Sequence, residues 1–403
     1  MTTTTRLPTD GGTAPSDRQV RLGVLGAVLV VAALVPLLFT GPGTDLDASS
    51  VVRTGRGIVQ HLSYTPSRAP GTPVYEAVVG VLDAMGGIPL ADLGSLLMAV
   101  VCAAAFWKLA KDGGIAHPLP TTLVVVANPW FLIAATSIED FVWALALMLV
   151  GVLALRSRHA WLAGVLFALA IGSRSTTVVL VAAAVLAALW EGRDARRDAA
   201  IAGGTAAVLG AALFVPAYLS ADRTFRFLHN DFATASPLVQ LGRFAVKDLY
   251  LFGPLAAIVM LFAVPAVFAL RSRWRQEWLV RFAFLGLLFS QLLFLRFPWK
   301  MGHLLPTVVF VALLLGLALG SRPRLLYGVV VAQLVTAFVT VNLFAPNHPN
   351  RATSASPELT AAWGPVVRDT QCRIRYRHDS LSPVRSVRER AGVCASPFAV
   401  VER

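Results

Sequence analysis

The stretch from Leu304 to Gly320, LLPTVVFVALLLGLALG, decides the fold class because it contains no charged residue. An apolar helix of about 20 residues crosses the roughly 30 Å hydrocarbon core of a bilayer, so this stretch is typical of a membrane-spanning helix. Similar runs recur along most of the chain, and we expect about eleven such spans. The spans are predicted at Leu22–Thr40, Ala91–Leu109, Pro118–Thr136, Phe141–Leu155, Trp161–Ile171, Thr177–Trp190, Ala199–Leu219, Leu251–Leu270, Leu279–Leu295, Leu304–Gly320 and Leu325–Phe344.

The composition of the 403-residue chain agrees with an all-α integral membrane protein. Hydrophobic residues make up 56% of the sequence and charged residues 14%, and the mean hydropathy is +0.67. A soluble domain of this size is much less apolar. The predicted architecture is a polytopic helical bundle with a long first extracytoplasmic loop that carries amphipathic helices, one of them over Pro73–Met85.

The chain divides into three predicted regions. Residues 1–20 are expected to be a disordered cytoplasmic N-terminus, too polar for a signal peptide, so that the first span is an uncleaved anchor. Residues 21–344 form the transmembrane bundle, with outer loops at 41–90 and 220–250. Residues 345–403 form an extracytoplasmic tail.

The distribution of Lys and Arg sets the predicted orientation. With the tail left out, more of them lie on the side of the N-terminus, in tight clusters such as Arg193, Arg196 and Arg197. Counting the tail arginines would reverse the balance, but the rule discounts long segments. Arg greatly outnumbers Lys, and both Ala and Val are abundant. This composition indicates a GC-rich bacterial genome. We therefore expect a multi-pass protein of the bacterial inner membrane with its N-terminus in the cytoplasm.

The first outer loop contains the residues most typical of chemistry. It opens with Gly43-Thr44-Asp45-Leu46-Asp47 and ends with Ser67-Arg68-Ala69-Pro70-Gly71-Thr72-Pro73. Paired carboxylates at a membrane surface, followed by arginine, suit general-base chemistry on a phosphate-linked substrate. A solvated connecting loop is the alternative interpretation of the same residues.

The three cysteines and the metal-binding patterns give further predictions. Cys102 lies within a predicted span and is expected to be a core residue. Cys372 and Cys394 follow the last span, where disulfides persist, and are predicted to pair. The sequence has no zinc-ligand or phosphate-loop spacing, which argues against zinc catalysis, a nucleotide motor and a nucleic-acid partner. No cofactor is predicted, although a divalent cation at the acidic loop stays open.

Several motifs together resemble the GT-C superfamily of integral membrane glycosyltransferases, which use polyprenyl-phosphate sugars and include the aminoarabinose and protein-mannosyl transferases. Family members place a catalytic acid just outside the first span, where this chain has Asp45 and Asp47. The family aromatic that often follows that acid is Ser49 here, so the choice between the two stays open. The other motifs that resemble the family are Tyr64, Arg68, Pro70, Gly71 and Pro73, then Ser137-Ile138-Glu139-Asp140, then Lys300-Met301-Gly302-His303-Leu304-Leu305-Pro306.

The resemblance implies transfer of a sugar from a polyprenyl-phosphate donor to an envelope glycan, lipid or protein. Asp45 or Asp47 would act as the base. A displacement with one base and no covalent intermediate inverts the anomeric carbon. The donor phosphate would be bound by Arg68, Lys300, Arg174 and His303. The other substrate contacts would come from Tyr64, Glu139 and Asp140.

Other interpretations of these residues stay open. His303 could cap a helix, Glu139 and Asp140 could complement a helix dipole, and Tyr64 could be an interfacial aromatic. A transporter or flippase for a lipid-linked sugar would need ionisable or helix-breaking residues within its spans. These are sparse here, and Asn128-Pro129 and Pro265 are the main interruptions. A non-catalytic envelope assembly protein would not need the acidic loop.

Overall fold

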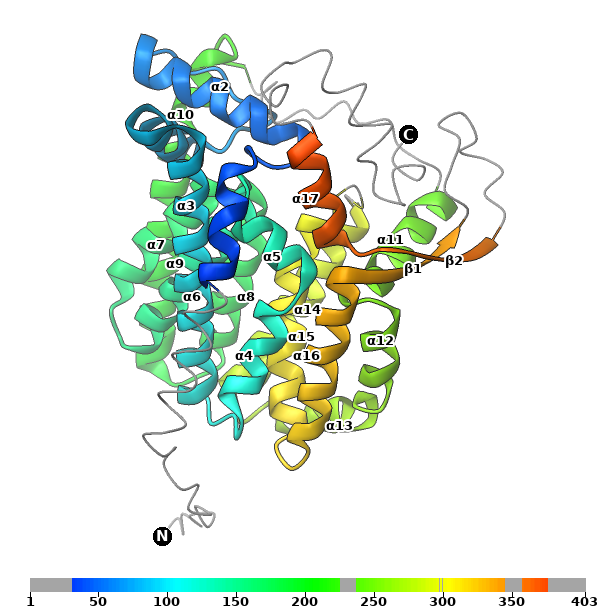
Figure 1. The fold of residues 1–403 in the computed structure, drawn as a ribbon. Coiled ribbons are helices and arrows are strands. Elements are labelled where there is room, and N and C mark those ends of the chain that lie inside the picture. Colours follow the sequence, from blue (N-terminus) through cyan, green and yellow to red (C-terminus); the bar gives the residue numbers. More distant parts are fainter. Residues whose placement is uncertain (1–30, 225–236, 297, 299, 345–356, 376–403) are drawn as a thin grey trace.

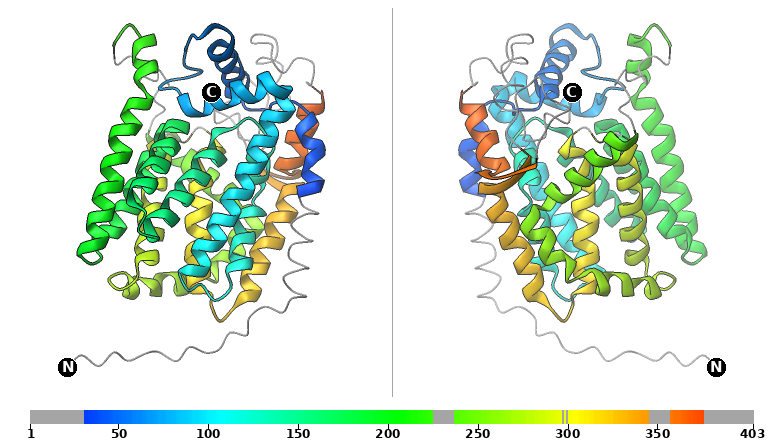
Figure 2. Two further views of the ribbon diagram at one scale, coloured as in Figure 1. Left: turned by 90° about the vertical axis from the view of Figure 1, so that its left-hand side faces the viewer. Right: turned by 90° about the vertical axis from the view of Figure 1, so that its right-hand side faces the viewer.

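The computed structural model describes residues 31–224, 237–296, 298, 300–344 and 357–375. Long apolar helices run side by side, and α2 (Leu46–His61) lies across one end of them (Figures 1 and 2). The other elements are η1 (Val35–Phe39), α3 (Pro73–Asp112), α4 (Pro118–Val126), α5 (Pro129–Ala135), α6 (Asp140–Arg156), α7 (Ala160–Ser173), η2 (Ser175–Thr177), α8 (Val178–Leu189), α9 (Arg193–Leu213), α10 (Val215–Ser220), α11 (Pro237–Phe252), α12 (Pro254–Leu261), α13 (Val264–Ala269), η4 (Leu270–Arg273), α14 (Trp278–Arg296), η5 (Met301–Leu304), α15 (Leu305–Ala318), α16 (Pro323–Phe338), β1 (Val339–Phe344), β2 (Pro357–Trp363) and α17 (Pro365–Arg375).

The described residues contain four helices that are long and apolar enough to cross a membrane, or up to six if each of two bent pairs counts as one span. The expected number of about eleven spans is therefore not confirmed. Ala160–Ser173, Ser175–Leu189 and Pro323–Phe338 coincide with predicted spans but are shorter apolar helices. The first predicted span, Leu22–Thr40, lies partly outside the described residues.

One predicted span is broken, and its break contacts a second bend, which lies at the start of the predicted span Leu251–Leu270. Pro118–Thr136 divides into α4 and α5, which are bent by 71°, and the bent pair over Gln240–Phe252 and Pro254–Leu261 turns by 87°. Pro129 lacks an N–H, and the Asn128 side chain caps α5 by accepting from Trp130 N and Phe131 N. The buried Asn128 amide also donates to Leu251 O at 2.8 Å.

Gln333 completes this buried junction. Its Oε1 accepts from Asn128 Nδ2 at 2.9 Å, and its Nε2 donates to Val124 O at 3.0 Å. A broken helix inside a membrane is tolerated only where its backbone groups find partners. The amide pair therefore stabilises the two breaks together.

The prediction of an all-α chain ending in a helix over Leu325–Phe344 is wrong at its C-terminal end. Helix α16 stops at Phe338, and β1 pairs with β2 in an antiparallel two-stranded sheet with Val339 opposite Trp363. The run Val339-Thr340-Val341 is β-branched, which favours a strand. Periodicity alone does not separate a short apolar strand from a helix, which explains the error.

The predicted interfacial helix Pro73–Met85 forms the first part of α3. Gly86 and Gly87 have non-helical backbone angles and separate it from the apolar part that follows. Helix α2 crosses this first part so closely that a Cβ on Gly80 would lie 2.3 Å from the carbonyl oxygen of Gly55. These glycines let the two loop helices pack backbone to backbone.

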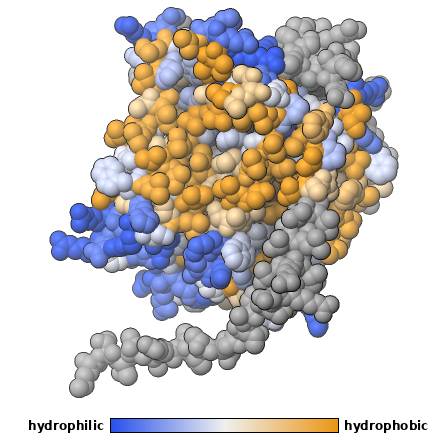
Figure 3. Space-filling model, turned by 60° about the vertical axis from the view of Figure 1, so that its left-hand side comes forward, coloured by the Kyte–Doolittle hydropathy of each residue, from blue (hydrophilic) through white to orange (hydrophobic). Residues whose placement is uncertain are grey.

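An apolar band covers the face of the molecule shown in Figure 3, with polar regions at both ends. Exposed apolar side chains on the helices of this side include Leu97, Leu162 and Val208. At the end away from α2, Arg156 pairs with Glu191 at 2.6 Å. Apolar spans between two polar ends are the arrangement of a multi-pass membrane protein.

Candidate active site

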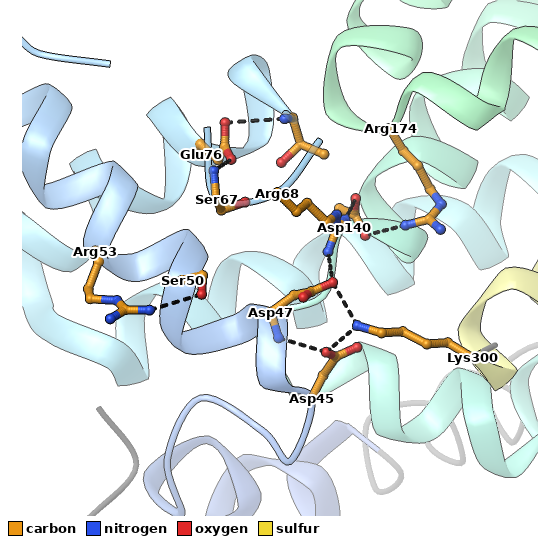
Figure 4. Close-up of polar contacts among 11 residues, drawn as sticks. Asp45, Asp47, Ser50, Arg53, Ser67, Arg68, Glu76, Asp140, Arg174 and Lys300 are labelled. Carbon is orange, nitrogen blue, oxygen red and sulfur yellow. Dashed lines mark hydrogen bonds and ion pairs between the residues drawn. The ribbon is translucent and has the colours of Figure 1, made fainter. Parts of the chain in front are cut away.

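Asp45 and Asp47 are oriented by the start of α2. Asp45 is the N-cap of this helix, and its Oδ1 accepts a hydrogen bond from Asp47 N at 2.8 Å. Aspartate is favoured at this position because its carboxylate accepts from the free N–H groups of the first turn. Figure 4 shows both carboxylates turned toward the ammonium of Lys300.

Lys300 joins the two carboxylates. Its Nζ lies 2.6 Å from Asp45 Oδ1 and 2.6 Å from Asp47 Oδ2. Lys300 precedes η5, which packs against α6 at Gly302: a Cβ there would lie 2.2 Å from the ring of Phe141. Only glycine permits this approach, so Gly302 helps to bring Lys300 across to the first loop.

Arg68 and Arg174 extend the ion pairs to a third carboxylate. Arg68 donates from one guanidinium nitrogen to Asp47 Oδ2 and from the other to Asp140 Oδ2. Arg174 donates to Asp140 Oδ1 at 2.8 Å, and its guanidinium carbon lies 3.8 Å from the centre of the Phe141 ring. The side chain of Asp140 is only 1% exposed. Three cations and three carboxylates thus form one connected network (Figure 4).

Glu76 holds the loop that carries Arg68. Its side chain is buried and accepts from Tyr64 Oη at 2.6 Å, Ser67 N at 2.8 Å and Thr72 N at 3.2 Å. Burial, and then the Glu76 carboxylate, raise the pKa of Tyr64. Tyr64, which was predicted to contact substrate, therefore closes this loop. The role of Glu76 was missed, because a glutamate in an amphipathic helix gives no local sign of a long-range contact.

The charges of the network shift the acidities of its members. Although burial acts to raise it, the cations of Lys300 and Arg68 hold the pKa of Asp47 well below its usual value. Burial, and then the carboxylates of Asp45 and Asp369, raise the pKa of Glu139 to about 8. Asp47 is therefore a firmly ionised partner of the cations, whereas Glu139 is protonated near neutral pH.

His303 lies near Phe141 and Arg174. Its ring centre is 5.7 Å from that of Phe141, and together with Arg174 it lines a pocket that reaches Ser290 and Thr177. The remaining lining is mostly apolar. The two residues that were predicted to bind the donor phosphate, Arg174 and His303, therefore share one pocket beside the ion-pair network.

The tail contributes to the site two residues that no sequence motif indicated. On α17, Asp369 Oδ1 accepts from Thr44 Oγ1 at 2.6 Å, and Asp369 pairs with Arg373 at 2.7 Å. The preceding residues of the tail give no motif that indicates this contact. The pairing of Cys372, which is buried on the same helix, stays a prediction because Cys394 lies outside the described residues.

Cys102 and the metal prediction complete the site residues. Cys102 is a buried free thiol, as expected. Among the described residues, no group of three or more His, Cys, Asp or Glu is arranged to hold a metal ion. The ammonium of Lys300 lies between Asp45 and Asp47, where a divalent cation was considered, and such a cation stays an untested prediction.

The comparisons with known proteins give a likeness at the level of the fold. No family model matches the sequence, and no curated protein is similar to it. The structure is similar to crystal structures of ArnT from Cupriavidus metallidurans, one in the apo state with a TM-score of 0.51 and one bound to undecaprenyl phosphate with a TM-score of 0.54. Both are 16% identical to this chain, cover 94% and 96% of it, and are themselves covered over 76% and 77% of their length. The chain therefore has a fold similar to that of these ArnT structures.

Proposed function

We propose that the chain is an integral membrane glycosyltransferase that moves a sugar from a polyprenyl-phosphate donor to a hydroxyl group of an envelope acceptor, with inversion. The observation that carries this proposal is the network of three cations and three carboxylates at the end of the bundle crossed by α2. The fold supports it, because ArnT of the same fold has been crystallised with undecaprenyl phosphate.

Asp45 is the better candidate for the base. Asp47 contacts both Lys300 and Arg68, and these cations keep its pKa well below the usual value. A base works best when its pKa lies near the working pH, so Asp47 accepts a proton poorly. Asp45 contacts only Lys300 among the described cations, so release of one ammonium frees its carboxylate.

The donor phosphate binds to Lys300 and Arg68 in this proposal. In the structure these cations are neutralised by carboxylates, so the anionic phosphate competes with Asp45 and Asp47 for them. Lysine and arginine both bind phosphate strongly through charge-assisted hydrogen bonds. When the phosphate takes the ammonium of Lys300, the carboxylate of Asp45 becomes available to the acceptor. Arg174 and His303 line the adjoining pocket and contact the same donor.

The transfer then proceeds in one displacement. The acceptor oxygen loses its proton to the Asp45 carboxylate and bonds to the anomeric carbon while the bond from that carbon to the phosphate oxygen breaks. The bonding electrons leave with polyprenyl phosphate, whose added negative charge is stabilised by Lys300 and Arg68. Attack from the face opposite the leaving phosphate inverts the configuration.

The same proposal assigns the location of the site. Basic residues cluster at the other end of the bundle, with Arg193 and Arg197 on α9 and Arg271 and Arg273 on η4. Positive charge favours the cytoplasmic side. The network therefore faces the outside of the bacterial inner membrane, where a glycan, lipid or protein of the envelope supplies the acceptor hydroxyl.

A lipid-linked sugar transporter is the second candidate, because broken helices are typical of transporters. The two breaks of this chain are weak support for a transporter. Asn128 and Gln333 each donate to a backbone carbonyl near the breaks, and Asn128 also donates to Gln333, which holds the two breaks together. A non-catalytic envelope assembly protein leaves the ion-pair network without a role.

Turnover by purified protein tests the proposal. Release of undecaprenyl phosphate is followed from undecaprenyl-phosphate sugars that carry a pentose or a hexose, with and without an envelope fraction as acceptor. Asp45→Asn should lower turnover by roughly 10²-fold or more, and Asp47→Asn by less. Asp83→Asn is the matched control, because Asp83 pairs with Arg56 on the same loop helices and not with the network. Full turnover in Asp45→Asn with loss in Asp83→Asn would reject the assignment.

A further inference from the structure

Helix α17 of the tail bonds to the segment that leads into Asp140. The guanidinium of Arg373 donates to the carbonyl oxygens of Thr136 and, at 3.5 Å, of Ile133. These carbonyls lie at the C-terminal end of α5, where helix carbonyls need partners from outside the regular pattern; Ile133 O also accepts from Ser137 Oγ at 2.6 Å. Asp140 follows four residues after Thr136, so Arg373 fixes the segment from which Asp140 reaches Arg68.

The same helix bonds to the segment that leads into Asp45. Asp369 accepts from the hydroxyl of Thr44 at 2.6 Å, and Thr44 directly precedes Asp45. The two segments also touch each other, because Ile138 N donates to Pro42 O at 2.9 Å. Asp369 and Arg373 are one turn apart and pair at 2.7 Å. One ion pair on α17 is therefore bonded to both loops of the candidate site.

The burial of this ion pair indicates a role other than stabilising the fold. The Asp369 and Arg373 side chains are 8% and 1% exposed. Removing two charges from water costs about as much as a buried ion pair returns, so such a pair is weak evidence for stability. Some buried polar pairs select one conformation among several. Here the pair fixes the position of Thr44 relative to Thr136.

We propose that Asp369 and Arg373 are positioning residues, which hold the candidate base Asp45 at its working distance from Asp140 and its bound Arg68. This inference rests on the proposed function. A displacement of about 1 Å at a reacting group costs up to roughly 10²-fold in rate. A tail helix that spans both loops restricts such displacement without touching either substrate.

Glu139 gives a readout that simple destabilisation would not change. It lies on the segment that Arg373 holds, and the charged groups around it include Asp45, Asp369, Arg373 and Lys300 and the buried Asp92 of α3. Asp369 is one of the carboxylates that raise the pKa of Glu139. Asp369→Asn removes that charge while keeping an oxygen that accepts from Thr44. It should therefore move any pH dependence due to Glu139 toward lower pH.

Variants at Thr44 test the bond to α17 without changing a charge. Thr44→Val keeps the shape and removes the hydroxyl, whereas Thr44→Ser keeps the hydroxyl. Thr44→Val should lower kcat by roughly tenfold to 10²-fold with KM for the undecaprenyl-phosphate sugar within about threefold, and Thr44→Ser should restore most of it. Gln371→Ala, an exposed change on the same helix, is the control and should match the wild type. The double variant Thr44→Val with Asp369→Ala should be no slower than the slower single variant, because both changes remove the same contact between Thr44 and Asp369.

The outcomes separate this inference from the proposed function. If Asp45→Asn abolishes turnover but Thr44→Val stays within twofold of the wild type, the positioning role is wrong and the proposed function stands. If Asp45→Asn keeps full turnover, the proposed function fails. Amide hydrogen exchange of residues 42–47 then decides the tether independently of turnover. Faster exchange in Thr44→Val but not in Gln371→Ala supports it, and equal exchange in all three proteins overturns it.

Discussion

Replacing Asp140 by Asn should destabilise the protein far more than the same change at Asp83. Among the described residues, Asp140 is the carboxylate that pairs with Arg174, and it is one of the two carboxylates that pair with Arg68. Its side chain is 1% exposed, and those of Arg68 and Arg174 are 25% and 11% exposed. The change therefore leaves two largely buried guanidinium groups with less negative charge near them.

The magnitude follows from the exposure of the cations. Breaking a buried ion pair by removing one partner costs about 3–5 kcal/mol. Because both arginines keep some contact with water, we expect the lower end, about 3 kcal/mol, or a fall in Tm of about 6 °C at roughly 2 °C per kcal/mol. Arg56, the partner of Asp83, is 42% exposed, and pairs with an exposed partner contribute about 1 kcal/mol or less. Asp83→Asn should therefore lower Tm by about 2 °C or less.

Undecaprenyl phosphate should reverse part of the loss in Asp140→Asn. A ligand that binds only the folded protein stabilises it by about 2.7 kcal/mol at a hundred times its Kd. In the wild type the phosphate competes with carboxylates for Arg68, whereas in Asp140→Asn the guanidinium has lost one of them. The ligand should bind more tightly to the variant and raise its Tm by more than it raises that of the wild type.

Thermal unfolding of the detergent-solubilised proteins, with and without undecaprenyl phosphate, measures both effects. Farnesyl alcohol in place of undecaprenyl phosphate controls for binding of the apolar chain alone. Equal falls in Tm for Asp140→Asn and Asp83→Asn would refute the reasoning about burial. A ligand-induced rise that is no larger in Asp140→Asn than in the wild type would refute the competition between phosphate and carboxylate.

Three further predictions follow from the site. Lys300→Met should weaken binding of undecaprenyl phosphate by about 1.5–3 kcal/mol, measured by titration calorimetry, while Lys108→Met, which breaks an exposed pair with Asp112, should leave affinity unchanged; equal losses would contradict the clamp. Because the pKa of Glu139 is raised from 4.5 to about 8, the folded state holds a proton that the unfolded state releases, so stability should fall as pH rises between these values and level off above them. Glu139→Gln should remove that part of the pH dependence of Tm, and an unchanged profile would show that Glu139 is not responsible. Labelling of intact cells with an impermeant thiol reagent should modify Cys372 and Cys394 only after reduction, whereas labelling only after the membrane is opened would place the tail in the cytoplasm.

The residues of the site that could be predicted from the sequence are those with a local sign. Asp45 and Asp140 are charges near the ends of apolar runs, where an ionisable residue costs energy and needs a reason, and Arg68 belongs to a stretch that resembles a family motif. Their convergence with Lys300 in one network adds the geometry that local patterns do not contain. The interruption at Asn128-Pro129 was also visible, since proline cannot continue a helix.

The parts that could not be predicted depend on contacts between distant segments. Thr44 and Asp369 are ordinary polar residues in the sequence, and only the fold brings them within 2.6 Å. Strand β1 continues an apolar helix without a break in composition, so its strand character depends on the partner strand β2. The expected number of about eleven spans is not confirmed, because several predicted spans are helices with the composition of a span but not its length.

The charge balance of the network explains how three cations are held at the end of the bundle that α2 crosses. Arg68, Arg174 and Lys300 are each paired with at least one carboxylate. They are therefore stabilised by the protein itself and need no lipid phosphate.

The same pairing limits how tightly a phosphate binds, because every contact that the phosphate gains on Lys300 or Arg68 displaces a contact to a carboxylate. In the proposed reaction that limit favours release of polyprenyl phosphate after transfer, since Asp47 regains both cations when the product leaves. Tighter binding of undecaprenyl phosphate to Asp140→Asn should accordingly be accompanied by slower product release, which pre-steady-state kinetics with a burst phase would reveal.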